Sequence, residues 1–119
     1  MRNLIDIKNL NQDAILEIIE LSKSLEIKNS DVLKNKNLGL IFEKPSTRTR
    51  LSFQVAINNL SGNFIDIKYD ELNLSRIESI EDTFKMFNLY LDSIILRTSD
   101  HNKFKTLSDN FDKPIINAL

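Results

Sequence analysis

The chain has 119 residues, 41% of them hydrophobic and 28% charged, which suits one compact domain that buries its own core. It contains no cysteine, so disulfides, thiolate zinc sites and a cysteine nucleophile are excluded. The formal net charge of −1 argues against nucleic acid or an anionic membrane as the main partner, and the absence of a signal-peptide or membrane-span pattern leads us to expect a cytoplasmic protein.

The first half of the chain contains three periodic segments. From Asn11 to about residue 27, apolar residues recur at three- and four-residue steps, which predicts an amphipathic helix with Asn11 as its N-cap. The apolar run Leu38–Phe42 predicts a strand covered on both faces. A second helix is predicted over about Arg48–Leu60, and Gly62 suits a left-handed cap at its C-terminal end.

The second half continues the alternation. Its predicted segments are a strand over Asn63–Ile67, a helix over about Ser79–Leu91, a strand over Ser93–Thr98, a helix over about Lys103–Phe111 and a final apolar strand within Ile115–Leu119. Ser79, with Asp82 three residues on, resembles a capping box. Because helices alternate with short apolar strands, we predict an α/β domain with a parallel sheet in a three-layer arrangement. Such sheets bind ligands outside the carboxyl ends of their strands.

The segment Ser46-Thr47-Arg48-Thr49-Arg50 stands where the first predicted strand ends and a helix begins. Backbone N–H groups at a helix start lack intrahelical partners, and the helix dipole favours an anion there. Hydroxyl and guanidinium groups add donors suited to phosphate. The pattern alone also fits a capped helix with solvated arginines, and it is the preceding strand and a second arginine, Arg97, that favour a site.

The two arginines of this segment are predicted to differ in role. Arg48 and Arg50 are two residues apart, which separates them by about 200° around a helix. We therefore expect Arg48 to face the ligand and Arg50 to be structural or paired with a carboxylate.

Other polar residues carry weaker signals. Arg97 ends a predicted strand, where a surface ion pair is as good an interpretation as a ligand contact. Asn117 lies near the end of the last strand, and His101, the only histidine, is expected to be a loop or capping residue. One histidine is a poor basis for a metal site, and the acidic stretch after Lys68 is interpreted as a solvated loop, so no metal or cofactor is expected.

The stretch "FEKPSTRTRLSFQVAINNLSG", followed in order by "ESIEDT", "YLDSIILRT" and "PIINAL", resembles the carbamoyl-phosphate-binding part of the transcarbamoylases. The lysine within "FEKPSTRTR" is similar to the ornithine branch of that family. The resemblance implies the N-terminal half of the transcarbamoylase fold over residues 1–119, with carbamoyl phosphate bound here and ornithine bound by a separate C-terminal domain. It also implies a homotrimer and a role in arginine biosynthesis.

The resemblance assigns roles residue by residue. It implies that Arg48 and Arg97 are catalytic, and it implies that carbamoyl phosphate is contacted by Ser46, Thr47, Arg48, Thr49, Asn73 and Arg97. Asn73 stands where the family usually has a glutamine, and Ser75 and Ile77 replace glycines usual nearby. The chain ends at Leu119, before the His-Pro-Cys-Gln element of the family, so we expect it to be an incomplete domain that is inactive alone.

Two hypotheses follow. The first is the carbamoyl-phosphate domain of an ornithine carbamoyltransferase, which converts carbamoyl phosphate and L-ornithine into L-citrulline and phosphate. The second is a non-catalytic anion-binding or oligomerisation module derived from a carbamoyltransferase. Another carbamoyltransferase, such as a putrescine-specific one, is a further alternative.

Overall fold

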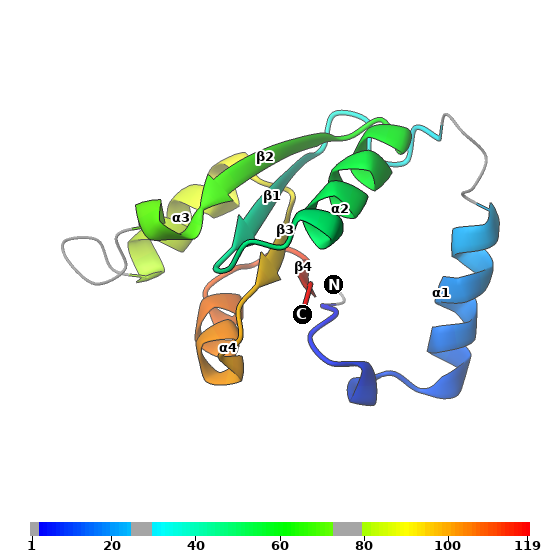
Figure 1. The fold of residues 1–119 in the computed structure, drawn as a ribbon, viewed down its shortest axis with the longest axis horizontal. Helices are drawn as coiled ribbons and strands as arrows, with labels where there is room; N and C mark the ends of the chain where they lie inside the picture. The colour runs from blue at the N-terminus through cyan, green and yellow to red at the C-terminus, as the bar shows by residue number, and fades with distance from the viewer. Residues whose placement is uncertain (1–2, 25–29, 73–79) are drawn as a thin grey trace.

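The computed structural model describes residues 3–24, 30–72 and 80–119. Within them, four strands form one parallel sheet in the order β2-β1-β3-β4 (Figure 1). The elements in chain order are η1 (Ile7–Asn9), α1 (Gln12–Ser24), β1 (Asn37–Phe42), α2 (Thr47–Asn59), β2 (Asn63–Lys68), η2 (Tyr69–Leu72), α3 (Ile80–Tyr90), β3 (Ser93–Arg97), α4 (His101–Asp109) and β4 (Ile115–Asn117).

Helices cover both faces of this sheet, so the predicted parallel, three-layer α/β fold is confirmed. Alternate residues of β1 point to opposite faces: Leu40 packs with Ile57 of α2, and Ile41 packs with Phe84 of α3 and Phe104 of α4. Burial on both faces is the reason that β1 reads as an unbroken apolar run.

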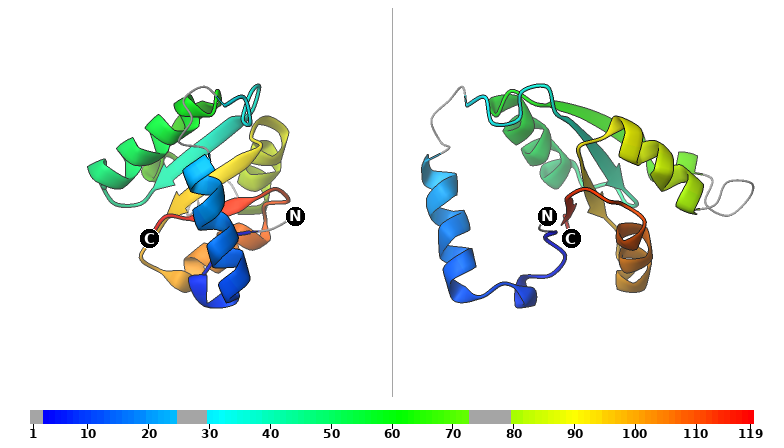
Figure 2. Two further views of the ribbon diagram at one scale, coloured as in Figure 1. Left: turned by 90° about the vertical axis from the view of Figure 1, so that its right-hand side faces the viewer. Right: turned by 180° about the vertical axis from the view of Figure 1, so that it is seen from behind.

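Helix α1 stands apart from the sheet in all three views (Figures 1 and 2). Asn11 caps it as predicted, accepting a hydrogen bond from Ala14 N at 2.8 Å. Ala14 is the buried residue of this helix, whereas Leu16, Ile18 and Leu21 are at least half exposed. The apolar face that predicted the helix is therefore largely uncovered.

The N-terminal segment was not predicted to join the sheet, but it lies beside β4. Leu4 forms a parallel bridge with Ile116, with Leu4 N donating to Ile115 O at 3.0 Å and Asn117 N donating to Leu4 O at 2.8 Å. Asn117 uses its side chain in the same place, where Nδ2 donates to Ile5 O at 3.0 Å.

Two local predictions were wrong. The left-handed residue after α2 is Ser61, with φ of 64°, and Gly62 does not have a positive φ. Gly62 is required for space instead, because a Cβ there would lie 2.9 Å from Leu33 Cβ. Helix α4 begins at His101 rather than near Lys103, since Asp100 is its N-cap.

One predicted helix start lies outside the described residues. Ser79, predicted to open α3, lies outside the described residues. In the part of the chain that the structure describes, no helix is long and apolar enough to span a membrane.

Candidate functional site

The predicted ligand-binding segments meet at the carboxyl ends of β1 and β3. These strands are neighbours, and Phe42, the last residue of β1, is in register with Arg97, the last residue of β3. Ser46 follows as the N-cap of α2, with Thr47, Arg48 and Thr49 in its first turn. The fold therefore brings the two segments to the same edge of the sheet.

Arg97 connects three elements at this edge. Its Nη1 donates to Thr49 Oγ1 at 3.3 Å and to the backbone oxygen of Ala118 at 2.8 Å. Both contacts use one nitrogen, and a guanidinium carries five N–H donors. Among the described residues no further partner of the Arg97 side chain is found, so Nε and Nη2 keep donors for a ligand.

The start of α2 presents unused donors. The first intrahelical bond runs from Arg50 N to Ser46 O at 2.9 Å, so the N–H groups of Thr47, Arg48 and Thr49 precede the helical ladder. The Ser46 side chain forms no capping hydrogen bond, and the first turn contains no acidic residue. The dipole of this 13-residue helix is therefore not offset by a nearby carboxylate in its own first turn.

Arg50 is paired with a carboxylate, as predicted. Arg50 Nη1 lies 3.7 Å from Asp66 Oδ1, and its guanidinium is 5.2 Å from the centroid of the Phe42 ring. Gln54 Nε2 also donates to Asp66, at 2.9 Å. Arg48 is exposed and, within the described residues, has no ion-pair partner. That Arg48 binds the ligand stays a prediction.

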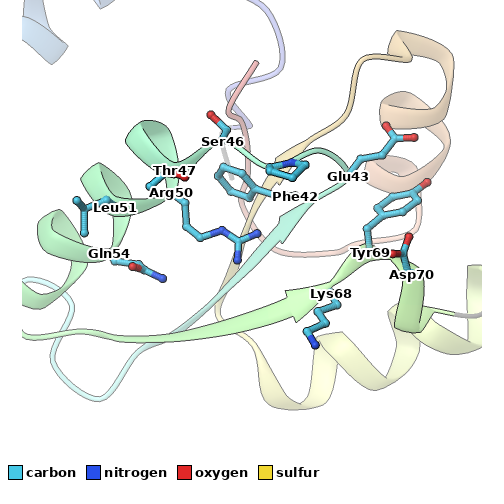
Figure 3. Close-up of a pocket in the computed structure, with 11 residues that line it drawn as sticks. Phe42, Glu43, Ser46, Thr47, Arg50, Leu51, Gln54, Lys68, Tyr69 and Asp70 are labelled. Carbon is cyan, nitrogen blue, oxygen red and sulfur yellow. The ribbon is translucent and has the colours of Figure 1, made fainter.

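A pocket of about 460 Å³ lies beside the start of α2 (Figure 3). Ser46 and Thr47 line it on one side, and Lys68, Tyr69 and Asp70 line it at the end of β2. Its lining, taken from the described residues, includes neither Arg48 nor Arg97. Ser46, Thr47 and Arg50 thus line this pocket, whereas Thr49 is the residue of α2 that contacts Arg97.

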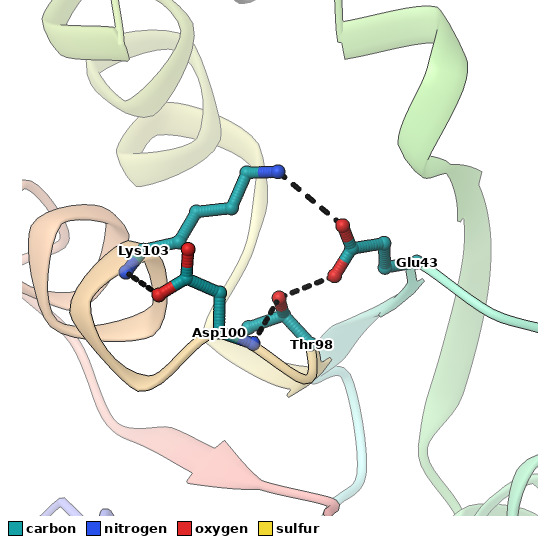
Figure 4. Close-up of polar contacts among 4 residues, drawn as sticks. All are labelled: Glu43, Thr98, Asp100 and Lys103. Carbon is teal, nitrogen blue, oxygen red and sulfur yellow. Dashed lines mark hydrogen bonds and ion pairs between the residues drawn. The ribbon is translucent and has the colours of Figure 1, made fainter.

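A polar cluster that the sequence did not predict lies next to these residues (Figure 4). The hydroxyl of the buried Thr98 donates a hydrogen bond to Glu43 Oε2, and Lys103 Nζ lies 3.3 Å from Glu43 Oε1. The hydrogen bond from Thr98 contributes most, and that from Lys103 adds to it, in holding the pKa of Glu43 below its ordinary value of 4.5. Burial acts in the opposite direction and raises this pKa.

Lys103 also lies 4.7 Å from the centroid of the Tyr69 ring. Tyr69 first, and Glu43 second, raise the pKa of Lys103 above its ordinary value of 10.5, against the effect of burial. By geometry Lys103 Nζ faces the Tyr69 ring and makes no hydrogen bond to the Tyr69 hydroxyl, which is buried and without a partner among the described residues. The ring contact and the Glu43 carboxylate are therefore the interactions that keep Lys103 charged. Lys103 is therefore a fixed positive charge between η2 and the β1–α2 loop.

One predicted ligand contact is not tested by the structure. Asn73, predicted to reach carbamoyl phosphate, lies outside the described residues, as do Ser75 and Ile77. Across the described ranges, no group of three or more His, Cys, Asp or Glu side chains is arranged to hold a metal ion.

Fold and site together define a parallel α/β domain whose strand ends present a helix start rich in hydroxyl and guanidinium donors. The family model described as "Aspartate/ornithine carbamoyltransferase, carbamoyl-P binding domain" matches residues 2–119. The chain therefore belongs to the aspartate/ornithine carbamoyltransferase family, through its carbamoyl-phosphate-binding domain.

Individual relatives agree with this assignment. The chain is 36% identical to an ornithine carbamoyltransferase of Archaeoglobus fulgidus over 100% of its own length and 40% of the relative. The solved ornithine carbamoyltransferase of Pyrococcus furiosus has a TM-score of 0.91 and 36% identity, covering 99% of this chain and 39% of that one. The catalytic subunit of M. jannaschii aspartate transcarbamoylase has a TM-score of 0.86 and 33% identity, covering 100% and 41%. The chain thus spans about 40% of the length of the relatives it matches.

Proposed function

We propose that this chain is the carbamoyl-phosphate-binding domain of an ornithine carbamoyltransferase and that it binds carbamoyl phosphate at the start of α2. The hydrogen bond from Arg97 to Thr49 supports this most directly, because it joins two segments separated by 48 positions at one edge of the sheet. The family membership supplies the ligand.

In the proposed complex the phosphate group lies on the N–H and hydroxyl groups of Ser46, Thr47 and Thr49, with Arg48 as counter-charge. Arg97 uses Nε and Nη2 to donate to the carbamoyl group. Asn73 is proposed to contribute a further contact from a neighbouring subunit. This division follows the chemistry, since charge grows on the phosphate as it leaves while the carbonyl oxygen gains charge during attack.

The proposed reaction is an acyl transfer. The δ-amine nitrogen of ornithine forms a bond to the carbonyl carbon, the bond from that carbon to the phosphate oxygen breaks, and the amine loses a proton. The products are citrulline and phosphate, the direction used in arginine biosynthesis. Positioning and charge stabilisation are sufficient for such a step, so the proposal includes no metal or cofactor. Ornithine and the proton acceptor are assigned to the separate ornithine-binding domain, so the present chain alone is proposed to be inactive.

The full-length protein is proposed to be a homotrimer, as the resemblance implies. Leu51 and Val55, one helical turn apart on α2, are 57% and 48% exposed, which is consistent with a subunit contact on this helix. A cytoplasmic location, expected because the sequence shows no signal-peptide or membrane-span pattern, stays a prediction.

Comparing two ligands tests the proposed site. Isothermal titration calorimetry of the chain with carbamoyl phosphate and with inorganic phosphate should show tighter binding of carbamoyl phosphate. Arg97→Ala should weaken carbamoyl phosphate binding roughly 10- to 150-fold, the equivalent of one charge-assisted hydrogen bond, and weaken phosphate binding less.

Lys105→Ala is the matched control, because it removes one positive charge from an exposed position of α4. Circular dichroism establishes that each variant is folded, and Arg97→Lys serves if Arg97→Ala is not. Equal losses for both ligands, or a loss in the control, would contradict the assignment of Arg97 to the carbamoyl group.

A further inference from the structure

Glu43 is the residue at which the two ligand-binding segments separate. Its backbone N–H donates to the Arg97 oxygen at 2.9 Å, in the last rung between β1 and β3. Beyond this pair of residues, the segment after β1 runs through a loop to Ser46 and α2, and the segment after β3 runs through Thr98 to α4. A hydrogen bond between the side chains of Glu43 and Thr98 joins these two segments just after they separate.

These contacts form a closed ring of four residues (Figure 4). Thr98 Oγ1 donates to Glu43 Oε2 and accepts from Asp100 N at 3.3 Å. Asp100 Oδ1 accepts from Lys103 N at 3.1 Å, and Lys103 Nζ returns to Glu43 Oε1 at 3.3 Å. Thr98 is 3% exposed, so water competes little with its hydrogen bond to the carboxylate.

The ring also controls where the negative charge of Glu43 lies. A carboxylate three positions before Ser46 would repel an anion bound at the start of α2 if it pointed there. Figure 3 shows the Glu43 carboxylate directed away from Ser46, on the side of Tyr69. Lys103 and Thr98 hold it in that direction, and the Lys103 ammonium offsets its charge.

We propose that Glu43, held by Thr98 and Lys103, is a positioning residue for the anion site, with no contact to the ligand itself. It fixes the loop that carries Ser46 relative to Arg97, whose own Nη1 contacts Thr49. The ligand named in this inference rests on the proposed function. The mechanical claim, that this ring orders the first turn of α2 against Arg97, stands on the contacts alone.

Conservative variants separate the hydrogen bond from the charge. In calorimetric titrations with carbamoyl phosphate, Glu43→Ala and Thr98→Val should each weaken binding roughly tenfold or more, because each removes a hydrogen bond to a charged group. Glu43→Gln should retain most of the affinity, since its amide oxygen can still accept from Thr98. Lys85→Met is the control, because it breaks an exposed ion pair on α3, Lys85 Nζ to Glu81 Oε1 at 2.8 Å.

Amide hydrogen exchange without ligand provides a readout that does not depend on binding. Glu43→Ala and Thr98→Val should speed exchange at Thr47–Thr49 and shift the Arg97 Nε–H signal, and Lys85→Met should do neither. Variants that unfold at lower temperature but keep the wild-type dissociation constant and exchange rates at these residues would overturn the proposal. If the wild type binds no carbamoyl phosphate, the proposed function fails, and the exchange data alone decide whether the ring positions the loop.

Discussion

Arg48 and Arg50 are expected to have different roles, so alanine substitutions of the two residues should have opposite effects on ligand affinity and on stability. Arg48 is exposed, and Arg50 contacts Asp66 and the Phe42 ring. Each alanine substitution removes one positive charge two positions from the other. General electrostatic effects are therefore similar, and only the local contacts differ.

The expected magnitudes follow from those contacts. Arg50→Ala loses an ion pair whose side chains are 35% and 40% exposed, worth about 0–1 kcal/mol, and a cation–π contact worth about 0.5–1 kcal/mol. Its free energy of unfolding should fall by roughly 0.5–2 kcal/mol. Arg48→Ala should change stability by no more than about 0.5 kcal/mol, as an exposed substitution does. Its binding of phosphate and carbamoyl phosphate should weaken by about 1.5–3 kcal/mol.

Urea denaturation measures the stability of both variants, and calorimetric titration measures their affinities. Arg48→Ala should lose affinity and keep stability, and Arg50→Ala should lose stability and keep its dissociation constants within about threefold. Equal affinity losses in the two variants would refute the orientation argument. Wild-type affinity in Arg48→Ala would refute the role of Arg48.

Two further predictions concern stability. Because the pKa of Glu43 is lowered below 4.5 in the fold, its carboxylate stabilises the protein fully above that pH, and the stabilisation is lost as the pH falls through the folded-state pKa. Urea denaturation at several pH values between about 3 and 7 should therefore show that the free energy of unfolding falls less toward low pH in Glu43→Gln than in the wild type. The same pH dependence in both proteins would contradict the assignment of this stabilisation to Glu43. Gly62→Ala should destabilise the chain by about 1–3 kcal/mol, because the new Cβ would lie 2.9 Å from Leu33 Cβ and 3.0 Å from Ile57 Cγ2. Asn59→Ala, at an exposed position of α2, is its control, and an equal effect in both would show that crowding at Gly62 is not the cause.

Strands and helices were predictable because their cause is local. Leu38–Phe42 and Ile94–Leu96 are buried on both faces, and this burial produces the continuous apolar runs. Asn11 caps α1 through a contact three residues away, which a short sequence window contains. The place of Arg97 beside Thr49 followed from the rule that parallel strands end at a common edge.

The remaining features depend on contacts that no local pattern encodes. Glu43 meets Thr98 and Lys103 across 55 and 60 positions, so neither residue marks the other in the sequence. Gly62 was interpreted from its common conformational use, whereas the structure requires it because Leu33 and Ile57 leave no space for a Cβ. His101 is the first residue of α4, not a loop or capping residue, because the Asp100 side chain accepts from Lys103 N and so caps the helix.

The bridge between Leu4 and Ile116 has a kinetic consequence. During N-to-C synthesis, residues 3–5 emerge long before β4 and have no partner there until more than 100 later residues have followed, as the separation of 112 between Asn117 and Ile5 shows. Closing a loop of this length has a large entropy cost, and contacts of high sequence separation slow folding. We expect this margin of the sheet to be the last part to assemble, after β1, β2 and β3 have already formed a stable centre.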